Sequence, residues 1–181
     1  MKRSLPTTQR VQRRSGRRAE RAVAPRERAQ APRPLITIAW ADHAREASQF
    51  ALQLCAALAK RGVSVAALLA TSGDEAIEGA RLGAFLESGA QAAKSVHVPA
   101  QGGERVLAEA FTHLSETAVV LALGNVVPQF YRPFFSIVVT GHRRQLISDD
   151  AQVLRADLEI TSPSQSLSEE LAKILQSRLP S

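Results

Sequence analysis

The stretch LITIAWADHAREASQFALQLCAALAKRGVSVAALLA, residues 35–70, decides how this chain folds. Its start, Leu35–Ala39, is a short apolar run that predicts a β-strand. Apolar residues then recur at helical spacing over His43–Lys60, and Gly62 follows as a C-terminal stop. Val63–Ala70 is a continuous apolar run, which is typical of a strand buried on both faces. A strand, a helix and a second buried strand in this order predict a parallel βαβ unit.

The rest of the chain repeats this alternation. We predict further helices over 72–88, 103–114, 149–155 and 167–179, and further strands over 95–99, 118–123, 135–140 and 158–161. Two capping-box pairs, Ser72 with Glu75 and Ser166 with Glu169, mark the starts of two of these helices. Because parallel crossover connections are right-handed, the pattern predicts a three-layer, Rossmann-like or P-loop-like α/β fold, in which a mostly parallel sheet carries helices on both faces.

Charge divides the chain into two parts. The protein has 181 residues and a formal net charge of +6. Residues 1–34 hold 11 Lys or Arg and two acids, a net charge of +9, whereas residues 35–181 hold 12 basic and 15 acidic side chains, a net charge of −3. The first segment also has four prolines and few large apolar residues. We therefore expect a disordered basic tail over 1–34 and a single α/β domain over 35–181.

Composition excludes several classes of protein. Cys55 is the only cysteine, so the chain has no internal disulfide framework, and its apolar neighbours predict a place in the core. The four histidines are scattered without ligand spacing, and we expect no metal site. No apolar run approaches the ~18 residues that cross a bilayer, and no apolar segment follows the N-terminal charges as in a secretory signal. We expect a cytoplasmic protein without a transmembrane segment.

The turn after the first predicted strand is where nucleotide-binding proteins carry the phosphate loop G-x-x-x-x-G-K-[ST]. That template places Trp40 and Arg45 at the two glycines, Glu46 at the lysine and Ala47 at the hydroxyl. Side chains thus replace the glycines that let the backbone approach phosphate, a carboxylate replaces the cation, and Ala47 has no oxygen for a metal. The other polar residues of this degenerate phosphate-loop region are Asp42, which can cap the helix, His43, and Ser48, a hydroxyl one position late.

Three stretches of the body point to a known family. They are Leu35–Gly62 running on into Val-Ser-Val, Gly83–Ala90 (GAFLESGA), and Val119–Val127 (VVLALGNVV) followed by Phe135–Val139. In these stretches the chain resembles the accessory protein family of molybdopterin-guanine dinucleotide biosynthesis, whose members are P-loop proteins. The resemblance implies a P-loop-like scaffold, protein partners from the molybdenum-cofactor machinery and, by analogy, a homodimer.

The chain departs from that family at the residues that would perform chemistry. The phosphate-loop glycines, lysine and hydroxyl are absent, and Leu123 precedes Gly124 where the family has an acid. We therefore expect a non-catalytic adaptor or regulator, a pseudo-NTPase without a required cofactor, linked to molybdenum-cofactor biosynthesis or molybdoenzyme maturation. Whether the protein is an enzyme stays open. The alternative is a nucleotide-binding enzyme, with GTP as the candidate ligand, in which Arg45 and Arg143 replace the lysine.

Two later segments offer contacts for an anion or a protein partner. Residues 130–135 contain four aromatics, which would form a contact patch if exposed. The segment after the predicted strand 135–140 corresponds to the base-reading loop of GTP-binding relatives, and its arginines suit an anion or an acidic surface. The candidate contacts are Asn125, Tyr131, Arg132, His142, Arg143 and Arg144.

The basic tail supports a third hypothesis. Clustered Lys and Arg attract polyanions by counterion release and long-range steering. Binding of nucleic acid or of another acidic surface through residues 1–34 is therefore a further alternative, although no aromatic residue lies among these charges to stack on bases.

Overall fold

The computed structural model describes residues 28–40, 44–72, 81–114, 116–140 and 156–180. Within these ranges six strands form one sheet in the order β4-β3-β5-β2-β7-β8, and every neighbouring pair is parallel. The strands are β2 (Leu35–Trp40), β3 (Val65–Thr71), β4 (Ala92–His97), β5 (Val119–Leu123), β7 (Phe135–Val139) and β8 (Leu158–Ile160). A separate two-stranded parallel sheet joins β1 (Ala29–Gln30) to β6 (Tyr131–Arg132).

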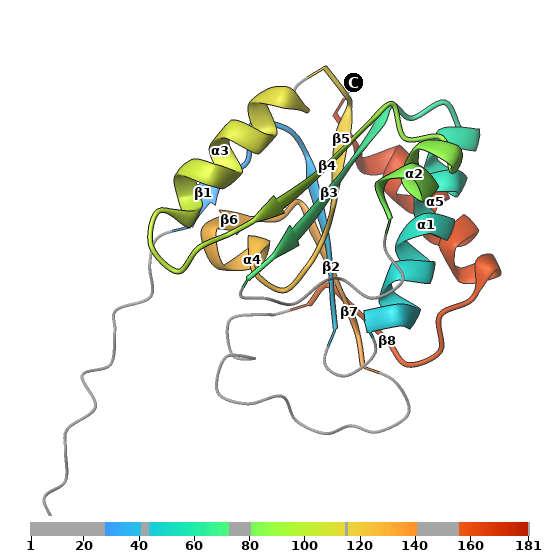
Figure 1. Cartoon of the computed structure of the whole chain (residues 1–181). Helices are drawn as coiled ribbons and strands as arrows, with labels where there is room; N and C mark the ends of the chain where they lie inside the picture. Colours follow the sequence, from blue (N-terminus) through green and yellow to red (C-terminus); the bar gives the residue numbers. More distant parts are fainter. Residues whose placement is uncertain (1–27, 41–43, 73–80, 115, 141–155, 181) are drawn as a thin grey trace, which may run out of the picture.

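Helices cover both faces of the six-stranded sheet (Figure 1). One face carries α1 (Ala44–Lys60), α2 (Leu82–Glu87) and α5 (Gln165–Arg178). The other carries α3 (Gly103–His113) and α4 (Val127–Phe130), beside the small β1–β6 sheet. The prediction of a three-layer α/β fold with a mostly parallel sheet is confirmed.

Alternate residues of the strands supply two separate hydrophobic cores. Ile36 and Ile38 of β2 belong to the core under α1, where they join Phe50 of that helix. Leu35, on the opposite face of the same strand, belongs to the core under α3 with Phe111. A strand buried on both faces has no solvent side, so its sequence reads as a continuous apolar run instead of an alternating one. This is why the apolar runs of the sequence predict β2, β3, β5 and β7.

The edge strand β4 begins three residues earlier and ends two residues earlier than we predicted. Its pairing runs from Ala66↔Ala92 to Thr71↔His97, whereas the apolar pattern pointed to 95–99. None of its six residues is fully buried, so its own side chains give a weak pattern. The prediction of one helix over 72–88 is wrong, because Arg81 has extended backbone angles of φ −129° and ψ 137° and caps the short helix α2. Residues 73–80 and the predicted helix 149–155 lie outside the described residues.

The last helix begins two residues before the predicted start. Ser164 is the N-cap, with extended backbone angles of φ −141° and ψ 159°, and its Oγ accepts a hydrogen bond from the Leu167 N–H at 3.2 Å. Ser166, which we predicted to be the cap, lies inside the first turn, and its hydroxyl is 3.2 Å from that of Ser164. Only Ser166 has the capping-box glutamate three residues later, but serine caps helices without it, and the extended backbone at Ser164 makes that residue the cap.

Residues 28–34, which we placed in the tail, belong to the folded body. Gln30 of β1 lies opposite Arg132 of β6, and the Arg28 guanidinium donates to the Pro128 carbonyl oxygen at 3.3 Å. Nothing in the local sequence signals this strand, because a two-residue strand exists only through its partner. Among the described residues, no helix has the length and apolar character needed to cross a bilayer.

Truncating a leucine of the first core tests this packing. Leu54 of α1 is fully buried, so Leu54→Ala is expected to lower the free energy of unfolding by about 2–5 kcal/mol, through lost burial and the cavity left behind. The matched control is Leu86→Ala, because Leu86 is 49% exposed, and it should change stability by less than about 0.5 kcal/mol. Urea unfolding measures both, and equal losses would contradict the placement of α1.

The two serines at the start of α5 give a second matched pair. Ser164→Ala removes the acceptor for the Leu167 N–H and should cost about 1 kcal/mol, as N-cap substitutions do. Ser166→Ala leaves that bond in place and should cost clearly less. Chemical denaturation of both variants decides the assignment, and a larger loss for Ser166→Ala would restore the original prediction.

Candidate functional site

The strand order places a topological switch point between β2 and β5 (Figure 1). From β2 the chain passes through α1 to β3, on the β5 side of the sheet. From β5 it passes through α4 and β6 to β7, on the other side of β2. Neighbouring strands whose connections leave in opposite directions open a crevice beyond their carboxyl ends, which is where open α/β sheets bind ligands. This edge is therefore the candidate ligand-binding site.

A side-chain amide joins the two strand ends at the switch point. The Trp40 N–H donates to Oδ1 of Asn125 at 2.9 Å, and Nδ2 of Asn125 donates back to the Trp40 carbonyl oxygen at 3.0 Å. Just before it, the Gly124 N–H donates to the Ile38 carbonyl oxygen at 3.0 Å. We call the two bonds between Asn125 and Trp40 the Asn125 latch. The latch extends the β2–β5 ladder beyond the end of β5, with a side chain in place of backbone.

Gly124 allows Asn125 to reach this position. Its φ of +140° is a conformation that L side chains rarely adopt, and an added Cβ would lie 2.0 Å from the Ala70 carbonyl oxygen. Because that neighbour is backbone of β3, it cannot move aside cheaply. The Gly-Asn pair after the apolar run of β5 thus has a local structural reason: the glycine brings the chain against β3, and the asparagine then bonds to β2.

The start of α1 exposes some of the degenerate phosphate-loop residues and buries others. Arg45 and Glu46 lie exposed in the first turn of the helix. Ala47 is fully buried, and Ser48 is buried with its hydroxyl donating to the Ala44 carbonyl oxygen at 2.7 Å. The Ser48 hydroxyl therefore supports the helix backbone and does not open toward solvent. Asp42 and His43, which we assigned to the same region, lie outside the described residues.

The later candidate contacts divide between the two edges of the sheet. Asn125 is exposed at the carboxyl edge, where it bonds the half-buried Trp40. Arg132 is exposed but lies close to the start of β7, at the amino edge. The structure therefore brings Asn125 to a residue of the degenerate phosphate loop and separates it from Arg132. His142, Arg143 and Arg144 lie outside the described residues.

Tyr131, which we expected in a contact patch if it were exposed, is buried in the second core. Its ring meets Phe111 of α3 edge to face, with centroids 4.9 Å apart and planes at 71°. Burial, and to a lesser degree the charge of Glu104, raise the pKa of the Tyr131 hydroxyl. The aromatic cluster thus supplies core packing through Tyr131 and leaves Phe134 as its exposed member. A single sequence cannot distinguish these two roles, because both favour aromatic residues.

The thiol of Cys55 lies inside the protein. Cys55 is fully buried in α1, as predicted, and burial raises the pKa of its thiol to about 11 despite a hydrogen bond with the Ala90 backbone. A thiol with such a pKa stays protonated near neutral pH and acts as a small apolar residue. Over the ranges that the structure describes, no three His, Cys, Asp or Glu side chains gather as a metal site requires.

No protein-family model matches the chain, and no curated protein matches it. Among solved structures, the chain is similar to a de novo designed protein with a P-loop NTPase fold, whose structure was determined by solution NMR. The two share 13% sequence identity with a TM-score of 0.47, and the match covers 81% of this chain and 93% of the designed one.

The Asn125 latch can be tested by changing one side-chain atom at a time. Asn125→Ala removes both bonds and should cost about 1 kcal/mol, because solvent replaces them at this exposed position. Asn125→Asp keeps the acceptor for the Trp40 N–H but places a carboxylate oxygen against the Trp40 carbonyl, so it should be no more stable than the alanine variant.

Gln129→Ala serves as the control, since Gln129 is exposed and its side-chain amide donates to the backbone carbonyl of Asn125, which is not part of the latch. Trp40 is the only tryptophan, so its emission and the exchange rate of its amide report directly on the latch. Both asparagine variants should speed that exchange. Unchanged protection of the Trp40 amide in Asn125→Ala would contradict the assignment.

Proposed function

We propose that this protein is a non-catalytic binding protein on a P-loop-like α/β scaffold, acting as an adaptor or regulator instead of hydrolysing nucleotide. The observation that carries the proposal is the Asn125 latch. Phosphate loops hold their ligand with free backbone N–H groups that point into the loop. Trp40 occupies the first-glycine position of that template, and its N–H is already bonded to Asn125. An amide bonded in this way is not available to a phosphate oxygen.

The charge at the first turn of α1 supports the same proposal. Glu46 stands at the position of the phosphate-loop lysine and is exposed there. A carboxylate at a helix N-terminus interacts favourably with the helix dipole, which gives Glu46 a structural role. The same carboxylate would repel a phosphate, because both would occupy the positive end of the helix.

The hydroxyl that would hold magnesium is also missing from the template position. Ala47 stands there and is fully buried. The next residue, Ser48, donates its hydroxyl hydrogen bond to the Ala44 carbonyl oxygen inside the helix. Magnesium in such sites takes oxygen ligands from a side chain and from the phosphates themselves. The lysine and hydroxyl of the phosphate-loop template are thus replaced, and the N–H at its first position is already bonded. A scaffold role fits these residues better than phosphoryl transfer.

For the partner we propose a protein of the molybdenum-cofactor machinery, because the sequence resemblance over three stretches points there. The carboxyl edge is the natural docking surface in this proposal, since it presents Asn125, Arg45 and Glu46 to solvent. Genes for molybdoenzymes or molybdenum-cofactor enzymes beside the gene of this protein would support the link. Their regular absence from that neighbourhood would count against it.

Nucleotide binding is the measurement that separates the two main hypotheses. Thermal unfolding with GTP or ATP at ~1 mM, with and without magnesium, should shift the Tm by less than about 1 °C, because a ligand that does not bind the native state does not stabilise it. Titration followed by the emission of Trp40, the only tryptophan, should likewise stay flat. A magnesium-dependent rise in Tm or steady phosphate release would contradict the proposal. If Arg45→Ala then abolished that rise, the protein would be a nucleotide-binding enzyme with an atypical loop.

A further inference from the structure

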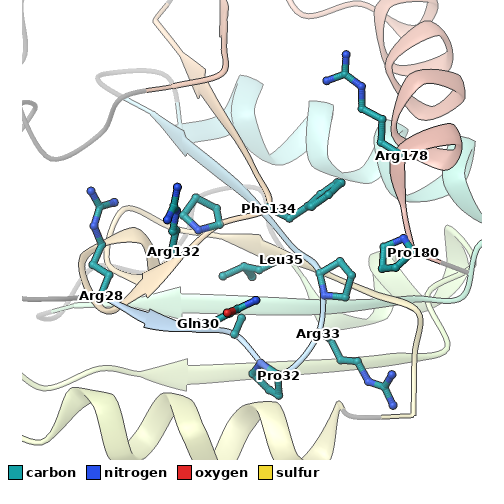
Figure 2. Close-up of a pocket in the computed structure, with 12 residues that line it drawn as sticks. Arg28, Gln30, Pro32, Arg33, Leu35, Arg132, Phe134, Arg178 and Pro180 are labelled. Carbon is teal, nitrogen blue, oxygen red and sulfur yellow. The ribbon is translucent and has the colours of Figure 1, made fainter.

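A groove of about 670 Å³ lies at the amino edge of the sheet, opposite the Asn125 latch (Figure 2). Among the residues that the structure describes, four arginines line it and no acidic residue does. Phe134, also a lining residue, is 40% exposed. The arginines are Arg28, Arg33, Arg132 and Arg178. Like charges gathered around a hollow create a positive potential that attracts an anionic ligand.

The fold brings these arginines together from distant parts of the chain. The parallel β1–β6 register sets Gln30 opposite Arg132, so Arg28, two residues before Gln30, shares the face of Arg132. Figure 2 shows the side chains of Arg28 and Arg132 extending in the same direction. Arg178 ends α5, and Arg33 precedes β2. Two arginines of the basic N-terminal segment thus line the same groove as two from a domain whose overall charge is negative.

Phe134 is held in this groove by its backbone. Its N–H donates to the Leu35 carbonyl oxygen at 2.8 Å, which fixes the segment between β6 and β7 against the start of β2. Figure 2 shows its ring on the same groove as the arginines. An exposed aromatic ring in a groove lined by arginines offers a planar apolar surface to the same ligand whose phosphates the guanidinium groups would bind.

We propose that this groove binds single-stranded nucleic acid. Guanidinium groups pair with phosphate oxygens in a bidentate manner, and an exposed aromatic ring stacks on a base whatever its identity. Residues 1–27, which precede Arg28 in the sequence, hold nine Lys or Arg against two acids, so the chain carries further positive charge that favours a polyanionic ligand. An acidic peptide would satisfy the arginines, but it would leave the Phe134 ring without a planar partner. The proposal does not depend on the function proposed for the carboxyl edge.

The first test removes charge inside and outside the groove in the full-length protein. Fluorescence anisotropy with a labelled single-stranded RNA of about 20 nucleotides gives the affinity over a range of NaCl concentrations. The double variant Arg132→Gln/Arg178→Gln should weaken binding about 25-fold at ~0.1 M NaCl and make the salt slope shallower by about 1.4, since each phosphate contact on a single strand contributes about 0.7.

The control variant Arg81→Gln/Arg105→Gln removes the same charge from two exposed arginines that do not line the groove. It should keep most of the affinity. Equal losses in the two double variants would show that general charge or the N-terminal segment binds the RNA, and would overturn the proposal. So would the absence of binding by the unmodified protein.

The second test separates nucleic acid from an acidic protein partner. Phe134→Ala should weaken RNA binding at least about fivefold without changing the salt slope, and Phe134→Trp should restore it, because stacking contributes about 1–3 kcal/mol per base. Circular dichroism checks that both variants are folded. Unchanged RNA affinity in Phe134→Ala would overturn the proposal, as would competition by polyglutamate at equal charge concentration.

Discussion

A parallel sheet covered on both faces gives its central strands no contact with water, so each N–H and C=O group in them needs a partner within the ladder. β2 is in this position, since Leu35 to Ala39 are buried and the strand pairs with β5 on one side and β7 on the other. The Asn125 latch meets the same need past the end of β5, because the N–H and the carbonyl oxygen of Trp40 both bond the side-chain amide of Asn125. Gly124 makes this possible by lying against the β3 carbonyl of Ala70.

The two edges of the sheet present surfaces of different chemistry. At the carboxyl edge, where folds of this class bind ligands, the chain bonds to itself, and the first turn of α1 carries Glu46 beside Arg45. At the amino edge, the short β1–β6 pairing and the end of α5 gather arginines around the exposed Phe134. Binding in this protein therefore need not follow the usual position for its fold class, because the groups that attract anions lie at the other end of the strands.

Much of the fold could be predicted because burial leaves a direct trace in the sequence. The strands β2, β3, β5 and β7 are continuous apolar runs, and α1 and α3 show an apolar stripe at helical spacing. The predictions were less accurate where an element depends on a partner. The strand β4 lies at the edge and is only half-buried, and β1 and β6 are two residues each. At the start of α5, the capping-box pattern pointed to Ser166, whereas the backbone angles make Ser164 the cap.

For the candidate site, residue identities are sufficient to predict that Trp40, Glu46 and Ala47 stand where a phosphate-loop template has a glycine, a lysine and a hydroxyl. The contacts that these positions make instead are visible only in the folded chain. Trp40 and Asn125 are 85 residues apart, and Arg28 and Arg132 are 104 apart, so no local pattern links them. Their meeting depends on strand order and register, and these are set by how the whole sheet buries its two faces.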